Sequence, residues 1–417
     1  MRQYVGEEGG PVVETSSPDV TASVVLANGA RPEVVREGDD FHFAWTRGMT
    51  YHLTFERADR APLTYVMNTE ELRHVQRELT RDGTTPDVGS RLDVSMTNVG
   101  PTPRFIALAT TGVWSFWTSV AMGTWSLDWT APDFFLSGRP RLLEPRDNAY
   151  CLEFDGVVDD VSGLAYNALK RSAKISVGMS NGEPLAAGCV LEDRVLEKCV
   201  QMVVDRTAEL ARMDQVIPAS FGPPNFATFV VAVPEPSFGP WLGPWLAQQA
   251  GNGPPTPFTG QVHYTNPFSG HNEAVRTGIS RVRSVTAKGS GMPTVLAPGA
   301  RQFYAATQNC GTATAIASVA IPSPPAFGGA FVVNDGELQL SRTRPIDVSW
   351  ELRADGPVDY YVVQLLELVA DAETNASRLV ERHAWVTRMQ EMMIPRETFE
   401  PDREYIVGIT TTYGWPN

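Results

Sequence analysis

The chain has 417 residues, of which 42% are hydrophobic and 20% are charged, and its formal net charge is −14. This length is sufficient for two or three domains with hydrophobic cores of their own, and the composition excludes a disordered or membrane-embedded protein. The acidic balance argues against nucleic acid as a partner, because neutralising phosphates requires a basic face.

The N-terminal segment is polar. Residues 1–17 are rich in Gly, Glu, Ser and Pro and contain no apolar stretch typical of a signal peptide, so we expect a flexible tether there. No run of about 18 apolar residues occurs, and we therefore expect no transmembrane segment. Two interpretations remain: a cytoplasmic protein, or an exported protein whose signal has been removed. We favour an extracytoplasmic location: secreted, at the cell surface or periplasmic.

Residues 18–150 predict a first β-sandwich domain. Residues 19–60 alternate between apolar and polar side chains around an Asn28-Gly29 turn, which indicates hairpins. The pattern of residues 68–83 predicts a helix, and residues 91–96 and 104–109 predict further strands. The region ends in an aromatic run that contains Trp125 and Trp129. Core packing is the simpler interpretation of this run, and a platform for stacking sugar rings is the alternative.

Residues 151–335 predict a second β-rich domain with one short helix near residues 207–213. Proline and glycine are dense between residues 222 and 260, where a Gly-Pro-Trp-Leu sequence occurs twice, around Trp241 and Trp245. Because proline stiffens such a loop and lowers the cost of ordering it, we predict that both tryptophans are exposed ligand-binding residues. A Tyr264-Thr-Asn-Pro-Phe268 segment follows.

The cysteines allow disulfides without fixing their pairing. The four cysteines, an even number, permit three pairings, and none has a Cys-x-x-Cys spacing. Cys189 and Cys199 are close enough in sequence to bridge a hairpin, so we predict this pair as a possible disulfide. Buried free thiols are the alternative, because cysteine behaves as a small hydrophobic residue.

Residues 336–417 predict a third domain of short strands. Trp350 ends one apolar strand, residues 360–368 form another, and a Phe399-x-Pro-x-x-x-Tyr405 element precedes a third. A tyrosine at the start of a late strand can bond back to the preceding corner. This domain resembles a fibronectin type III domain, with Trp350 as the core tryptophan and Tyr405 as the corner tyrosine. The residues after position 413 are too few for the expected closing strand.

No catalytic or metal-binding constellation stands out. Gly178-Met-Ser180-Asn-Gly182 matches the nucleophile elbow of hydrolases, but no helix pattern follows it. A turn between strands explains the motif better. The six histidines lack the helical spacing of zinc sites. We therefore predict no catalytic residues, no metal and no cofactor.

The whole layout is similar to uncharacterised exported β-rich proteins of myxobacteria. We predict a mainly β protein of tandem antiparallel β-sandwich domains with a C-terminal fibronectin type III-like domain and a few short helices. Its predicted function is that of a non-catalytic structural, adhesive or ligand-binding protein whose partner is a protein or a surface glycan. A secreted hydrolase, acting on carbohydrates or esters, and a glycan-binding module are the two alternatives.

Overall fold

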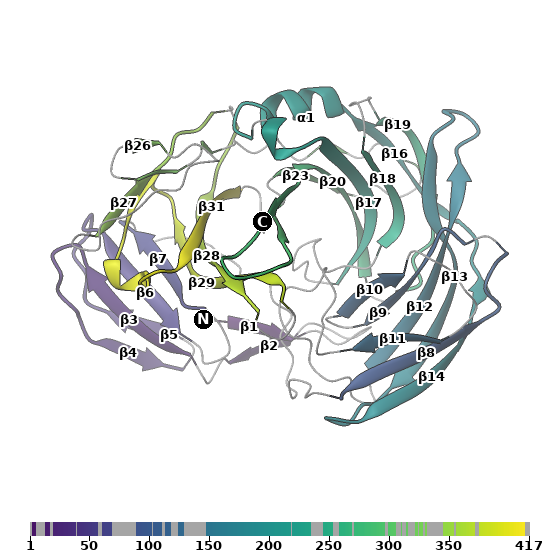
Figure 1. The fold of residues 1–417 in the computed structure, drawn as a ribbon, viewed down its shortest axis with the longest axis horizontal. Coiled ribbons are helices and arrows are strands. Elements are labelled where there is room, and N and C mark those ends of the chain that lie inside the picture. The colour runs from purple at the N-terminus through teal and green to yellow at the C-terminus, as the bar shows by residue number, and fades with distance from the viewer. Residues whose placement is uncertain are drawn as a thin grey trace.

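The computed structural model confirms a mainly β fold that contains several sheets (Figure 1). It describes residues 2–5, 13–16, 20–38, 40–56, 61–68, 89–101, 103–110, 113–117, 124–128, 147–217, 219–234, 245–252, 258–268, 271–296, 299–305, 310, 314–315, 322–323, 325–327, 330–331, 345–353, 356–371 and 375–412. The helix expected at residues 68–83 lies outside these ranges, except for Asn68.

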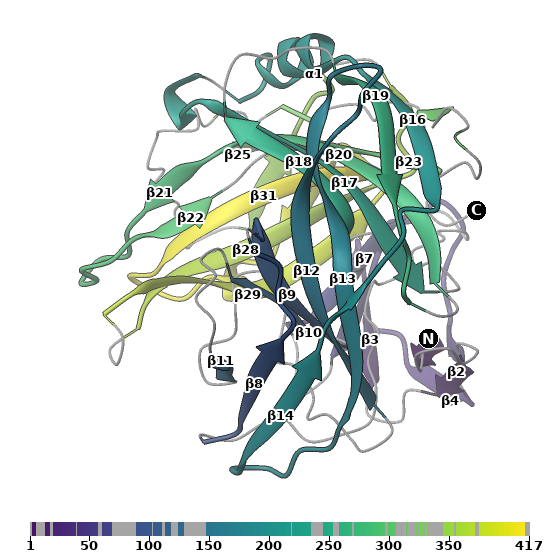
Figure 2. The same cartoon turned by 90° about the vertical axis from the view of Figure 1, so that its right-hand side faces the viewer.

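The largest sheet has ten strands in the order β10-β9-β12-β13-β18-β17-β20-β23-β24, with β15 also paired to β13. Its long central strands are curved (Figure 2). Its members are β9 (Phe105–Thr110), β10 (Val113–Trp117), β12 (Asp147–Val158), β13 (Ala165–Val177), β15 (Glu192–Asp193), β17 (Pro224–Pro234), β18 (Trp245–Asn252), β20 (His271–Arg281), β23 (Gly299–Ala305) and β24 (Thr314–Ala315).

Each face of the ten-stranded sheet is covered by another set of strands. On β12, Tyr150, Leu152 and Phe154 pack with the pair β16 (Lys198–Val204) and β19 (Phe258–Tyr264). Ala149 and Cys151 point to the opposite face, as expected because successive side chains of a strand alternate. There they meet a three-stranded sheet of β11 (Thr124–Asp128), β8 (Arg91–Thr97) and β14 (Pro184–Val190).

The strand patterns explain these layers. In β8, Leu92, Val94 and Met96 are buried and alternate with more exposed residues, which is the signature of a strand with one covered face. The expected short helix is α1 (Arg206–Met213). It begins at Asp205, whose carboxylate accepts hydrogen bonds from the backbone N–H groups of the first turn.

The C-terminal region forms a sandwich of two sheets. A four-stranded sheet, in the order β26-β25-β27-β30, faces a six-stranded sheet in the order β3-β6-β7-β29-β28-β31. Their members are β25 (Ala326–Phe327), β26 (Ala330–Phe331), β27 (Ile346–Ser349), β30 (Glu391–Ile394), β3 (Thr21–Leu26), β6 (Tyr51–Glu56), β7 (Leu63–Met67), β28 (Tyr360–Ala370), β29 (Ser377–Thr387) and β31 (Glu404–Thr412).

Strands from the two ends of the described chain share the six-stranded sheet. β7 pairs in parallel with β29, so in Figure 1 the purple N-terminal strands lie beside the yellow-green C-terminal ones. The domain boundaries expected at residues 150 and 335 remain predictions. The parallel pairing shows in addition that residues 21–67 contribute strands to the six-stranded sheet of the C-terminal sandwich.

The remaining elements are short. They are β1 (Arg2–Val5), β2 (Val13–Ser16), β4 (Val34–Glu37), β5 (Asp40–Phe43), β21 (Arg283–Val285), β22 (Thr294–Leu296) and the 3-10 turns Ala219–Phe221 and Arg396–Thr398. The segment around β21 and β22 docks on the turn between β28 and β29, where Asn375 accepts hydrogen bonds from the backbone N–H groups of Gly291 and Met292. A Cβ on Gly291 would meet the Asn375 carboxamide, so a larger residue there would require this side chain to move.

Candidate functional site

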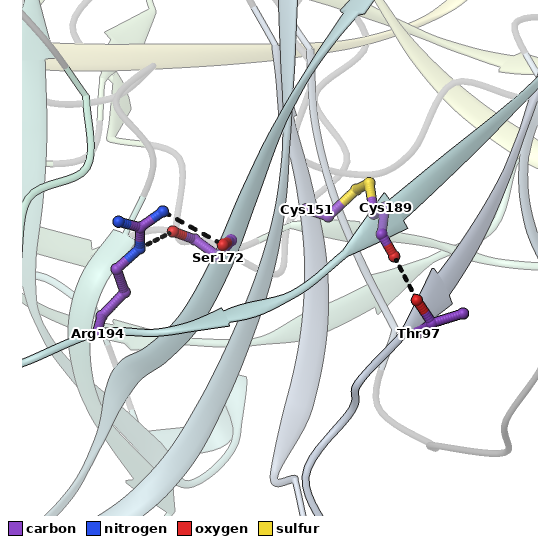
Figure 3. The surroundings of a disulfide bond; sticks show 5 residues. All are labelled: Thr97, Cys151, Ser172, Cys189 and Arg194. Carbon is purple, nitrogen blue, oxygen red and sulfur yellow. Dashed lines mark hydrogen bonds between the residues drawn. A yellow bond between two sulfur atoms is a disulfide. The ribbon is translucent and has the colours of Figure 1, made fainter.

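A disulfide joins the ten-stranded sheet to the three-stranded sheet. Cys151 of β12 bonds to Cys189 of β14 across a buried apolar core (Figure 3). The Thr97 hydroxyl of β8 donates a hydrogen bond to the Cys189 carbonyl at 3.3 Å. The disulfide therefore fixes two layers of the fold to each other.

A second disulfide, Cys199–Cys310, ties the start of β16 to the segment between β23 and β24. The Cys310 N–H also donates a hydrogen bond to the Cys199 carbonyl. The predicted Cys189–Cys199 bridge is wrong, because each of the two cysteines pairs with a partner outside their shared segment. Sequence proximity misled that prediction, since β14 and β16 belong to different layers.

Of the four tryptophans predicted to bind a ligand, the structure describes the side chain of Trp245 alone. Trp245 is only 6% exposed and packs against Phe105 and Phe229 at the start of β18. The prediction of an exposed Trp245 is therefore wrong, because Trp245 begins β18 (Trp245–Asn252) and belongs to the core. Trp241 and Trp129 lie outside the described residues, and the side chain of Trp125 in β11 does as well.

Ser180 lies in a turn between two strands. β13 precedes it and β14 follows it, the Glu183 N–H donates to the Ser180 carbonyl, and Gly182 has a φ of 76°. The Gly182 N–H donates a hydrogen bond of 2.7 Å to Ser90 Oγ. The turn matches the expectation from the sequence, and the helix that a nucleophile elbow requires does not follow Ser180.

The two residues predicted to be structural lie in the C-terminal sandwich. Trp350 is 3% exposed and meets the Tyr361 ring edge-on, with the ring centroids 5.2 Å apart. The Tyr405 hydroxyl accepts a hydrogen bond of 3.0 Å from the Glu400 N–H, and its ring meets Phe399 edge-on. The corner before β31 is thus held by the tyrosine that the sequence indicates.

Two buried glutamates, one in the ten-stranded sheet and one in the C-terminal sandwich, form ion pairs with arginines. Glu153 of β12 is fully buried, and its Oε1 lies 2.5 Å from Arg171 Nη1. Its oxygens also accept hydrogen bonds from the Gly100 N–H at 2.9 and 3.1 Å. Glu367 of β28 lies 2.5 Å from Arg382 and 3.5 Å from Arg403. Such pairing is required because an unpaired buried charge is costly, so we interpret both clusters as structural.

A buried arginine lies next to the start of α1. Arg206, at the start of the helix, is buried and bonds to Gln249 and Thr228. Burial lowers the pKa of its guanidinium. A cavity beside these groups, lined also by Tyr166, has a volume of about 10 Å³, which is enough for one water molecule.

A polar cluster that the sequence did not reveal lies at the start of β16. We call Lys198, Asn266 and Glu273 the β16 cluster. Glu273 Oε1 lies 2.5 Å from Lys198 Nζ and accepts a hydrogen bond of 2.8 Å from Asn266 Nδ2. The Asn266 Oδ1 accepts another from the Phe268 N–H at 3.0 Å. The three residues come from β16, the β19–β20 connection and β20.

An apolar wall lines the β16 cluster. Tyr264, which pairs with Lys198 across the ladder, is 1% exposed, and Phe268 is 5% exposed. Burial, together with the negative charge of Glu273, raises the pKa of the Tyr264 hydroxyl. The Glu273 carboxylate is thus close to the protein interior, and its side chain is only 9% exposed.

Other classes of site have no support among the described residues. No group of three or more His, Cys, Asp or Glu side chains in that part of the chain has the arrangement of a metal site. No helix there is long and apolar enough to cross a membrane. No family model matches the chain, and no curated protein matches it.

Proposed function

We propose that the protein is an exported, non-catalytic β protein that acts as a structural or adhesive binding protein at the bacterial cell surface or in the periplasm. The observation that carries this proposal is that all four cysteines of the chain are joined in two disulfides. Disulfides form and persist in oxidising compartments and are rare in the bacterial cytosol. Both bonds join separate layers, as is useful in a protein that must resist unfolding outside the cell.

The C-terminal sandwich supports a presenting or spacing role. β25, β27 and β30 form one sheet and β29, β28 and β31 pair in the other, with Trp350 in the core and Tyr405 bonded at the corner. This arrangement supports the resemblance to a fibronectin type III domain. The partner in this proposal is a protein or a surface glycan.

The location is tested by expressing the full chain twice in a bacterium, once with an added export signal and once in the reducing cytosol. We expect no free thiols under denaturing conditions in the exported protein and four in the cytosolic protein. The exported form should also have the higher melting temperature. Four free thiols in the exported protein, or equal melting temperatures, would contradict the proposal.

The partner class is tested by quenching tryptophan fluorescence with iodide and acrylamide, with and without a panel of polysaccharides. Trp245, Trp350 and Trp385 are buried, so we expect these residues to contribute no sugar-dependent protection. Protection that disappears in a Trp241→Ala variant would select a glycan partner over a protein partner.

A further inference from the structure

The β16 cluster combines an amine, a carboxamide and a bridging carboxylate. We propose that Lys198 and Asn266 form an intramolecular isopeptide bond, with Glu273 as the catalytic acid and base. This modification goes beyond the proposed function and does not depend on it, because it follows from the chemistry of three side chains. It also gives a role to the Tyr264-Thr-Asn-Pro-Phe268 segment that the disulfides and the sandwich leave unexplained.

The nitrogen atoms of the two reacting groups both lie within hydrogen-bond distance of one carboxylate oxygen. Glu273 Oε1 is 2.5 Å from Lys198 Nζ and 2.8 Å from Asn266 Nδ2, so a single carboxylate can take a proton from the first nitrogen and give it to the second. General acid–base catalysis needs this hydrogen-bond reach to both groups. Lysine amines are established covalent nucleophiles in proteins once they have lost their proton.

Hydrogen bonds hold both polar atoms of the carboxamide. Asn266 Oδ1 accepts a hydrogen bond from the Phe268 N–H, which stabilises the negative charge that develops on this oxygen when an amine attacks Cγ. Asn266 precedes Pro267, whose nitrogen carries no hydrogen. The next backbone nitrogen therefore cannot attack the side chain, and Lys198 is the neighbouring nucleophile.

The surroundings shield the carboxylate from bulk water. Glu273 is 9% exposed and lies beside the buried residue Tyr264, and partial exclusion of water strengthens the hydrogen bonds that its carboxylate accepts from Lys198 and Asn266. The Lys198 side chain remains 41% exposed, which leaves ammonia a path to solvent.

The reaction balances without an oxidant or a cofactor. Glu273 takes a proton from the Lys198 ammonium, and the free amine forms a bond from Nζ to Asn266 Cγ. The bond from Cγ to Nδ2 then breaks as Glu273 returns the proton to the leaving nitrogen. The newly bonded Nζ still carries one surplus proton, which the departing ammonia accepts, so ammonium leaves and the neutral chain is lighter by one ammonia.

The new bond would lie beside an existing covalent link. Lys198 is adjacent to Cys199, which is bonded to Cys310, so the start of β16 would be tied to two distant segments. The isopeptide bond would close the loop from residue 198 to residue 266, and it would persist under reducing conditions that open both disulfides.

The test is mass spectrometry of the exported full-length protein after complete reduction and alkylation. We expect the intact mass to be lower than the sequence mass by one ammonia, and a proteolytic fragment in which the peptides of Lys198 and Asn266 are joined. The chain has only four lysines, at positions 170, 174, 198 and 288, so the assignment is direct.

Two variants and one matched control identify the residues. Lys198→Arg retains a positive charge beside Glu273 but removes the amine, and Glu273→Gln removes the proton acceptor. Both should have the full sequence mass. Lys174→Arg, in β13 of the same region, should keep the mass loss. Circular dichroism then verifies that each variant folds, and the linked fragment of the wild-type protein needs no variant at all.

Three results would overturn the proposal. The first is a wild-type protein of full mass after prolonged incubation in the folded state. The second is a loss of ammonia that persists in Lys198→Arg, which would assign the loss to a succinimide at Asn28-Gly29 or Asn181-Gly182. The third is conversion of Asn266 to aspartate, which would show that water attacks Cγ before the amine does.

Discussion

The two regions of the molecule secure their sheets in different ways. The ten-stranded sheet and its covering layers contain both disulfides, whereas the C-terminal sandwich contains no cysteine and joins strands from residues 21–67 with strands from residues 360–412. Among the described residues, Glu153 is buried beside arginine in the first region and Glu367 in the second. The difference teaches that the ten-stranded region links its stacked layers covalently, whereas the sandwich holds its two sheets together through their shared apolar core and joins distant segments by strand pairing.

The largest expected effect comes from removing a disulfide of the ten-stranded region. Replacing Cys199 and Cys310 by serine removes a link across 111 residues, and chain entropy assigns such a link about 4 to 5 kcal/mol of stability. We expect β16 and β20 to lose protection in hydrogen-exchange mass spectrometry while β28 and β31 keep theirs. An equal loss in both regions would show that the two regions unfold as one unit.

The second largest effect is expected from a substitution in the core of the C-terminal sandwich. Trp385 of β29 is 1% exposed in the core between the two sheets, and truncation of a buried tryptophan to alanine costs about 3 to 5 kcal/mol. Trp385→Ala should therefore lower the urea midpoint of the sandwich. Trp245→Ala is the matched control, because it should act on the ten-stranded sheet. If both variants weakened the same region, the comparison would fail.

Local patterns in the sequence predicted the strands well. β8 and β28 alternate as expected, and α1 matches the predicted helix to within one residue. Tyr405 was identified because its corner bond spans only five residues. Trp245 was misassigned because proline and glycine precede it, although burial is decided by Phe105 and Phe229 from other strands.

The sequence alone does not predict which distant segments meet in the fold. Nothing in residues 63–67 indicates pairing with residues 384–387, since any apolar strand satisfies the same pattern. The cysteine pairing depends on which layers stack, and the β16 cluster unites side chains from three separate elements. Such sites carry no spacing motif, because their residues meet only in the folded chain.

The third prediction tests the contacts between β7 and β29 through the pH dependence of the stability of the sandwich. His383 Nε2 lies 2.8 Å from Thr64 Oγ1, which lies 2.8 Å from Thr54 Oγ1, so the three side chains form a chain of contacts across three strands. The His383 ring also stacks on Trp385. Burial lowers the pKa of His383 to about 4, so protonation favours the unfolded chain.

The sign follows from the lowered pKa. The stability that neutral His383 contributes is complete above its unfolded pKa, near 6.5, and is lost as the pH falls towards 4, in total about 3 kcal/mol. Urea unfolding of the sandwich between pH 7 and pH 4 measures this slope. His383→Gln should remove most of it. Burial lowers the pKa of His52 in β6 as well, so His52→Gln serves as the control for the remaining slope.

The smallest effect tests the corner of the sandwich. Tyr405→Phe keeps the edge-on contact with Phe399 and removes the oxygen that accepts the Glu400 N–H. Loss of one such hydrogen bond costs about 1 kcal/mol, whereas Tyr405→Leu also loses the ring contact, which adds about 1 kcal/mol. The difference between the two variants in urea unfolding separates the hydroxyl from the ring. If Tyr405→Phe were as stable as the wild type, the corner bond would not stabilise the sandwich, and the resemblance to a fibronectin type III domain would lose its most specific contact.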